Sequence, residues 1–159
     1  MVKVGLLTVS DLGSQGKRED TAGMRLKEMV EAAGWTVSCQ EIVPDEKEII
    51  SARLREWADS IAVHLVLTTG GTGFSERDVT PEATTEVLDK ETPGISEAIR
   101  LSGLQKTPHA MLSRGVSGIR QQTLIVNLPG SEKGARESLE AIISALPHAI
   151  DVILGNPGH

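Results

Sequence analysis

Short, nearly continuous apolar runs alternate along the chain with longer segments of helical periodicity. The runs at Lys3–Ser10, Val63–Thr68 and Thr123–Leu128 lack the polar alternation of a half-solvated strand, which is typical of strands covered on both faces. Parallel strands of this kind need crossover connections of about a dozen residues or more, and the intervening segments have that length. The sequence therefore predicts an α/β fold with a mostly parallel central sheet and helices on both of its faces.

Local start and stop signals place the expected helices. Asp20 or Thr21 is expected to cap a helix that ends at Gly34, and Asp45 forms a capping pattern with Glu48 before the next helix. The remaining expected elements are a loop over 11–20, a strand over 35–43 nearer an edge, a helix with Thr80 as cap and Pro81 in its first turn, a helix over Ile95–Leu104, two strands joined near Gln121 and Gln122, and a helix from Ser131 that Pro147 interrupts.

The composition is that of one globular unit. The 159 residues suit one compact domain that buries about two thirds of its unfolded surface, and no repeat or linker divides residues 1–159. The single cysteine, Cys39, can form no internal disulfide. The four histidines are scattered, which disfavours a zinc site.

Charge and hydropathy disfavour two classes of partner. The net charge of −6 and an aromatic content of 2% disfavour nucleic-acid binding, because neither a basic footprint nor stacking platforms are present. No apolar run approaches the roughly 18 residues of a membrane-spanning helix, and no basic-then-apolar leader opens the chain. We therefore expect a soluble cytoplasmic protein that binds neither nucleic acid nor membrane.

Small polar residues and glycines follow three of the predicted strands. Ligands bind beyond the carboxyl ends of the strands in open α/β sheets, so these three segments are expected to meet at one crevice. Glycines let the backbone approach an anion, and a helix that starts at Ser131 would offer its positive end to phosphate. The candidate phosphate-binding residues are Ser10, Thr69, Gly70, Gly71, Thr72, Gly73, Asn127, Pro129, Gly130, Ser131 and Lys133. Ordinary strand-to-helix turns are the alternative interpretation.

The glycine loop at 69–73 matches neither familiar nucleotide loop. A Walker A loop needs Lys and Ser or Thr after its last glycine, and here Phe74 and Ser75 follow Gly73. A dinucleotide fingerprint needs a further small residue, and Glu76 stands there instead. P-loop ATP hydrolysis and hydride transfer on NAD are therefore both disfavoured.

Two carboxylates close to these loops are candidates for catalysis. Asp78 follows the glycine loop, and a carboxylate beside a phosphate site requires a cation such as Mg²⁺ between them. Asp78 could instead pair with Arg77 or stabilise a turn. Asp45 could instead serve only as the helix cap described above. The sequence pattern leaves both alternatives open.

Two long motifs resemble one known family. The segments "TTGGTGFSERDVTPEA" and "NLPGSEKGARE", with "VGLLTVSD", "IVPDE", "TPG" and "LSRGVSGI", resemble molybdenum-cofactor-biosynthesis proteins of the MogA/MoaB type, which include the G domain of gephyrin. The resemblance covers essentially the whole chain. It implies a three-layer αβα fold, a homotrimer, and adenylylation of molybdopterin by Mg-ATP with release of pyrophosphate.

The resemblance also assigns roles to residues of this chain. The family's essential aspartates fall on Asp45 and Asp78, which would position Mg²⁺, and the phosphate-binding candidates named above would surround molybdopterin and ATP. Some MoaB-type relatives resemble non-catalytic carriers and lack the first aspartate; this chain retains Asp45, which favours an active enzyme. Because the chain ends at "NPGH" without a second catalytic domain, we expect the product to pass to a separate molybdate-inserting enzyme.

Overall fold

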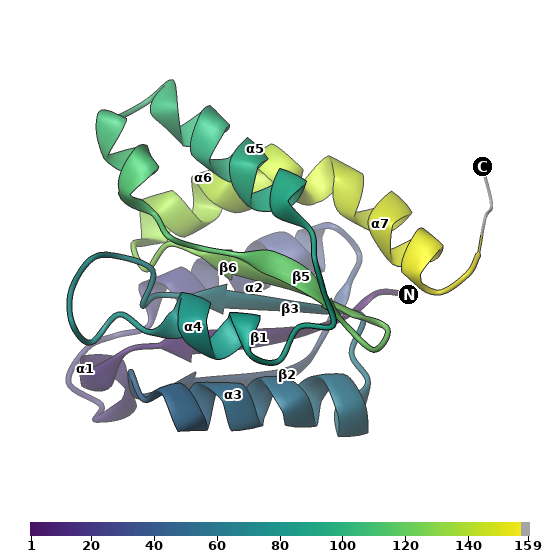
Figure 1. The fold of residues 1–159 in the computed structure, drawn as a ribbon, viewed down its shortest axis with the longest axis horizontal. Coiled ribbons are helices and arrows are strands. Elements are labelled where there is room, and N and C mark those ends of the chain that lie inside the picture. Colours follow the sequence, from purple (N-terminus) through teal and green to yellow (C-terminus); the bar gives the residue numbers. More distant parts are fainter. Residues whose placement is uncertain (157–159) are drawn as a thin grey trace.

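The computed structural model describes residues 1–156 and contains one six-stranded sheet (Figure 1). The strand order is β2-β1-β3-β6-β5-β4. The strands are β1 (Lys3–Val9), β2 (Thr36–Val43), β3 (Leu65–Thr69), β4 (Lys90–Glu91), β5 (Ser117–Arg120) and β6 (Thr123–Leu128). Strands β2, β1, β3 and β6 pair in parallel, whereas β5 and β4 run antiparallel at one edge. The predicted mostly parallel sheet is confirmed.

Helices cover both faces of this sheet. They are α1 (Asp11–Ser14), α2 (Thr21–Ala32), α3 (Lys47–Glu56), α4 (Thr80–Thr85), α5 (Pro93–Leu104), α6 (Glu132–Ile142) and α7 (Leu146–Ile153), with short π or 3₁₀ turns η1 (Trp57–Ile61), η2 (Pro108–Leu112) and η3 (Ile143–Ala145). In Figure 1, α5, α6 and α7 lie on one side of the sheet and α3 and α4 on the other. None of the helices within residues 1–156 is long and apolar enough to cross a membrane.

Two hydrophobic cores explain this three-layer arrangement. Successive side chains of a strand point to opposite faces, so Leu6 of β1 packs with α2, α5 and α6 while its neighbour Leu7 packs with α3 and α4. In β3, Leu67 and Val66 divide between the two cores in the same way. Burial on both sides is the reason that these strands lack polar alternation.

The chain reverses direction across the sheet between β1 and β3. From β1 it crosses outward to β2, and from β2 it returns past β1 to β3. The loops after β1 and β3 therefore leave toward opposite faces and open a crevice between them, as at the switch point of other open α/β sheets. This crevice positions the candidate site.

Several local details differ from the sequence-based expectation. The helix that starts after Ser131 ends at Ile142, before Pro147, and Pro147 lies in the first turn of α7. The predicted loop over 11–20 contains the short helix α1, and β4 is an additional strand of two residues. The N-cap position of α3 is Glu46 and not Asp45, that of α4 is Val79 and not Thr80, and neither residue makes a side-chain capping hydrogen bond. In both cases the side chain that was expected to cap its own helix bonds instead to a segment outside that helix, as described below.

Gly5 lies within the interior strand β1, where a glycine normally weakens a sheet. The ring of Trp57 covers it: a β-carbon at residue 5 would lie 2.7 Å from Trp57 Cε3 and 3.1 Å from Cys39 Sγ. Trp57 is 3% exposed. The absence of a side chain at residue 5 thus gives the indole its place in the core.

Replacing Gly5 by Ala is expected to lower the free energy of unfolding by about 1–3 kcal/mol, because the added methyl group overpacks the space of Trp57. Chemical denaturation followed by circular dichroism measures this change. Gly94→Ala is the matched control, since a β-carbon there meets nothing within 4 Å and Ala is the better helix former. Equal stability of the Gly5 variant and the wild type would contradict the packing argument.

Candidate functional site

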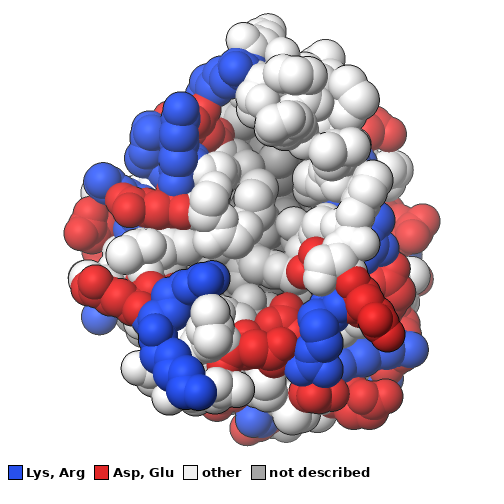
Figure 2. Space-filling model, turned by 90° about the vertical axis from the view of Figure 1, so that its left-hand side faces the viewer, with Lys and Arg blue, Asp and Glu red and all other residues white. Residues whose placement is uncertain are grey.

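The three loops expected to converge do so. Ser10, Gly71 and Ser131, which follow β1, β3 and β6, line one cavity of about 520 Å³ at the switch point. Thr69, Gly70, Gly130, Asp45 and Asp78 also line it. Figure 2 shows this side of the molecule, which is hollowed at its centre, with acidic and basic side chains along its lower rim. The predicted meeting of distant loops is confirmed.

Glycines set how closely these loops approach. At Gly70 the φ angle is +102°, and a β-carbon would overlap the carbonyl oxygen of Val9. A β-carbon at Gly130 would lie 3.2 Å from Gly70 Cα. Hydrogen bonds hold the contact, since Gly70 N donates to Leu128 O at 3.1 Å and Thr69 Oγ1 donates to Pro129 O at 2.6 Å.

The glycine loop is also tied to the helix that follows it. Thr80, fully buried, donates its hydroxyl to Gly70 O at 2.9 Å and its backbone N–H to Gly71 O at 3.1 Å. Thr80 therefore anchors the loop and does not cap α4. The cap of α6 is as predicted, because Ser131 Oγ accepts a hydrogen bond from Gly134 N at 3.0 Å.

Asp11 and Asp45 line this cavity and are joined by two reciprocal hydrogen bonds. Asp11 N donates to Asp45 Oδ2 at 2.9 Å, and Asp45 N donates to Asp11 Oδ1 at 3.0 Å. Arg77 from the glycine-loop side donates to both oxygens of Asp11, at 2.8 and 3.1 Å, and to Glu46 at 3.1 Å. Asp45 thus bonds to the loop after β1 and not to its own helix, which corrects the capping interpretation.

The pKa values of Asp11 and Asp45 shift in opposite directions. Hydrogen bonds from the Arg77 guanidinium, followed by the backbone N–H of Asp45, lower the pKa of Asp11. Burial raises the pKa of Asp45, and the charges of Asp11 and Asp78 raise it further against the opposing backbone hydrogen bond. The cavity floor therefore holds a carboxylate whose charge is poorly compensated by the protein.

Asp78 lies on the same cavity, at the end of the glycine loop. Its Oδ2 accepts a hydrogen bond from Ser75 N at 3.0 Å, and a β-carbon at Gly73 would lie 2.9 Å from that oxygen. Arg77 pairs with Asp11 and Glu46. Of the two alternatives open from sequence, the structure shows the turn contact rather than an ion pair with Arg77.

Carboxylate oxygens are suitable ligands for Mg²⁺, and Asp45 and Asp78 line the same cavity. Within residues 1–156, no group of three or more His, Cys, Asp or Glu side chains is arranged to hold a metal ion. Mg²⁺ commonly binds to one or two carboxylates and takes its remaining ligands from water and substrate phosphates. The donor set fits an ion that arrives with a phosphate substrate.

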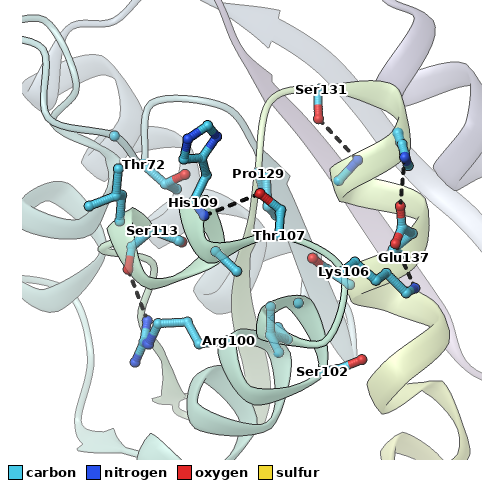
Figure 3. Close-up of a pocket in the computed structure, with 18 residues that line it drawn as sticks. Thr72, Arg100, Ser102, Lys106, Thr107, His109, Ser113, Pro129, Ser131 and Glu137 are labelled. Atoms are coloured by element: carbon cyan, nitrogen blue, oxygen red, sulfur yellow. Dashed lines mark hydrogen bonds and ion pairs between the residues drawn. The ribbon is translucent and has the colours of Figure 1, made fainter.

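A second cavity of about 410 Å³ adjoins the first (Figure 3). The glycine loop, the α5–η2 segment and the start of α6 supply its lining, and Ser131 lines both cavities. The predicted residues Thr72, Gly73, Pro129 and Lys133 line this second cavity and not the first. The sequence did not indicate that the candidate ligand residues would divide between two adjacent spaces.

Basic side chains outnumber acidic ones in the lining of the second cavity, where Glu137 is the acidic residue among those that the structure describes. Arg100, Lys106 and Lys133 line it, with His109 facing the same space in Figure 3. Glu137 pairs with Lys106 at 2.5 Å and with Lys133 at 4.0 Å, and the hydrogen bond from Lys106 lowers the pKa of Glu137. Arg100, Lys106 and His109 were missed from sequence because no motif surrounds them; only the fold brings their segment beside the glycine loop.

Asn127 lies elsewhere than predicted. Its side chain is buried, donates to Thr68 and Thr84 at 3.0 Å, and accepts from Val116 N at 3.1 Å. It belongs to the described linings of neither cavity. In the described part of the chain, Asn127 connects β6 to β3, α4 and the segment before β5.

This geometry defines a class, the α/β proteins that hold small anionic ligands across a switch point of a parallel sheet. A family model described as "Probable molybdopterin binding domain" matches residues 5–148, and the chain belongs to that family. The resemblance recognised in the two long motifs is thereby confirmed.

Named relatives agree with this assignment. The chain is 43% identical over 157 residues to the molybdopterin adenylyltransferase of Helicobacter pylori, covering 98% of this chain and 89% of that protein. It is 47% identical over 153 residues to the molybdenum cofactor synthesis protein cinnamon of Drosophila melanogaster, but spans only 26% of that protein. The crystal structure of the molybdopterin biosynthesis enzyme MoaB from Thermus thermophilus is similar with a TM-score of 0.94 at 53% identity, covering 100% of both chains.

Replacing Asp45 by Asn is expected to raise the midpoint of thermal unfolding at pH 7. Because the folded-state pKa of Asp45 is raised above 3.8, its ionisation opposes folding, and the cost develops as the pH rises from 3.8 through the raised value. Asn retains an oxygen that accepts from Asp11 N. The stabilisation should therefore vanish toward about pH 3, where the wild-type carboxyl is neutral.

Differential scanning calorimetry between pH 3 and pH 8 makes this measurement, with the exposed Asp151→Asn as control. A helix cap behaves in the opposite way and costs about 1 kcal/mol when removed. A lower midpoint of the Asp45→Asn variant at pH 7 would restore the capping interpretation.

Proposed function

We propose that this protein transfers AMP from Mg-ATP to the terminal phosphate of molybdopterin and releases pyrophosphate. The observation that carries the proposal is the pair of adjoining cavities that share Ser131 and the glycine loop. A transferase must hold two substrates with their reacting atoms in contact, and two spaces with one common rim meet that requirement. Relatives that are 41–44% identical are named molybdopterin adenylyltransferase, which supports the same reaction.

Charge favours one assignment of substrates to cavities. The cavity with Asp45 and Asp78 takes the nucleotide, because only a phosphate chain that carries Mg²⁺ is compatible with two carboxylates. The cavity with Arg100, Lys106 and Lys133 takes molybdopterin, whose dithiolene and phosphate are anionic. The molybdopterin phosphate then lies at the shared rim near Ser131.

In the proposed reaction, a phosphate oxygen of molybdopterin forms a bond to the α-phosphorus of ATP. The bond from that phosphorus to the oxygen bridging toward the β-phosphorus breaks, and pyrophosphate leaves. Mg²⁺ bound to the nucleotide would neutralise charge on its phosphates. Catalysis in such a step is mostly positioning and charge neutralisation.

The chain's own groups supply that positioning. Backbone N–H groups of the glycine loop and the N-terminal end of α6, capped by Ser131, bind phosphate oxygens. Asp45 and Asp78 hold the metal-bearing nucleotide, and Lys133, whose side chain is 79% exposed, is free to reorient toward developing charge. Arg77 forms ion pairs with Asp11 and Glu46, so it is not assigned to the substrate phosphates.

Assembly and cellular context extend this proposal. We treat residues 1–159 as a single molybdopterin-binding domain that forms a homotrimer, works in the cytoplasm and passes its product by transient contact to a molybdate-inserting enzyme. The first three points rest on family resemblance and composition, and the last on the chemistry of the product. Multi-angle light scattering distinguishes a trimer of this 16.9 kDa chain from a monomer.

Incubation of the purified protein with molybdopterin, ATP and Mg²⁺ tests the reaction. Mass spectrometry should detect adenylylated molybdopterin, and a coupled assay should detect an equal amount of pyrophosphate. Molybdopterin that stays bound without pyrophosphate release would instead identify a carrier, which is the alternative function. Addition of EDTA should abolish turnover, since the carboxylates then face the phosphates without a cation.

Replacing Asp78 by Asn is expected to lower turnover by about a hundredfold, equivalent to about 3 kcal/mol. Asn keeps the acceptor for Ser75 N, so the melting temperature should stay near that of the wild type. The coupled pyrophosphate assay measures the loss. Glu76→Gln, two residues away and exposed, removes a charge from the same loop as control; near-normal turnover of the Asp78 variant would reject its role.

A further inference from the structure

Arg114 holds the glycine loop from outside the two cavities. Its Nε donates to Gly73 O at 2.8 Å and its Nη2 donates to Asp78 O at 2.8 Å. Its backbone N–H donates to Thr72 O at 2.9 Å. One residue thus binds carbonyl oxygens at both ends of the segment 72–78, and Asp78 is the last residue of that segment.

Arg77 also restrains the segment 72–78 from outside, because its guanidinium pairs with Asp11 and Glu46, but this contact acts through a side chain and leaves the backbone carbonyls of the segment to Arg114. Within it, Asp78 N donates to Ser75 O and Ser75 N donates to the Asp78 carboxylate, both at 3.0 Å. Residues 74–77 are exposed. An exposed loop of this kind opens at low free-energy cost unless contacts from the rest of the fold restrain it, and charge-assisted hydrogen bonds are among the strongest restraints available.

Arg114 is itself held by the wall of the second cavity. Arg100 of α5 donates to Ser113 O at 3.3 Å and to Gly115 O at 2.9 Å, on either side of Arg114 (Figure 3 shows the contact with Ser113). Glu82 of α4 accepts from Arg114 Nη1 at 2.6 Å. Arg114 therefore connects α5, which lines the second cavity, to the loop that carries Asp78 at the first cavity.

We propose that Arg114 is a positioning residue for adenylyl transfer: it fixes the glycine loop so that Asp78 lies at the nucleotide cavity. The proposal rests on the function proposed above, because it assumes that Asp78 acts on the nucleotide. Arg114 lines neither cavity within the described residues, so it acts through the two carbonyl oxygens and not by touching substrate.

The fork of the guanidinium group is essential to this role. Its planar N–H donors reach Gly73 O, Asp78 O and Glu82 at the same time, whereas a lysine ammonium is a single point with flexible geometry. Arg114→Lys is therefore expected to retain the pairing with Glu82 but lose at least one carbonyl contact. Misplacement of a reacting group by about 1 Å costs about a hundredfold in rate.

Three variants separate positioning from general stability. Arg114→Ala is expected to lower kcat by about a hundredfold with little change in KM for molybdopterin, and Arg114→Lys should recover only part of this loss. Glu82→Gln removes the charge paired with Arg114 but leaves an oxygen acceptor, so its kcat should stay within about twofold of wild type. If Glu82→Gln lost as much activity as Arg114→Ala, the ion pair rather than the carbonyl contacts would explain the effect.

A double-mutant cycle tests whether Arg114 acts through Asp78. In the Asp78→Asn background, Arg114→Ala should cost less than about threefold, because the group that it positions is already inactive. A loss of kcat in the double variant equal to the product of the two single-variant losses would overturn the proposal, because independent sites behave in that way.

Hydrogen exchange provides a readout that does not depend on activity. Amides of residues 72–78 in unliganded Arg114→Ala should exchange about tenfold faster than in wild type, while α2 and β1 stay unchanged. Unchanged exchange of 72–78 would overturn the positioning role. Absence of pyrophosphate release by the wild type would overturn the proposed function instead, so the two failures are distinguishable.

Discussion

The carbonyl oxygen of Val9 lies so close to Gly70 that no side chain could stand between them, and a β-carbon at Gly130 would lie 3.2 Å from Gly70 Cα. These contacts bring the ends of β1, β3 and β6 together at the switch point of the sheet. Adjacent parallel strands always end at one edge, but only residues without a β-carbon allow the turns themselves to touch. The crevice and its backbone donors depend on this close approach.

The crevice contains a carboxylate, Asp45, whose negative charge the protein compensates poorly. Burial and two neighbouring aspartates raise the pKa of Asp45, and the charge of Arg77, which pairs with Asp11 and Glu46, lowers it only in part. Functional sites commonly carry such destabilising groups, because the substrate supplies the missing charge. Under the proposed function, the Mg²⁺ carried by the nucleotide would supply that charge, and the unfavourable electrostatics of Asp45 in the free protein would favour binding of such a ligand.

The two cavities differ in charge and share one wall. The acidic cavity lies between the loops after β1, β2 and β3, whereas the basic cavity lies between α5, η2 and the start of α6. The glycine loop and Ser131 border both of them. A reaction that joins two anionic substrates benefits from this division, because each substrate meets a compatible field and only the reacting groups meet at the rim.

The sequence by itself determined five of the six strands, most helix ends, the glycine loop and the aspartates of interest. These features are local, since apolar periodicity, capping patterns and glycine turns act over a few residues. The tertiary structure decided which side chains meet: Asp45 bonds to Asp11 rather than to its own helix, Asn127 is enclosed in the core, and the predicted ligand residues divide between two cavities. Such contacts join residues 34 to 59 positions apart, and no local pattern distinguishes a carboxylate that caps a helix from one that bonds to a distant loop.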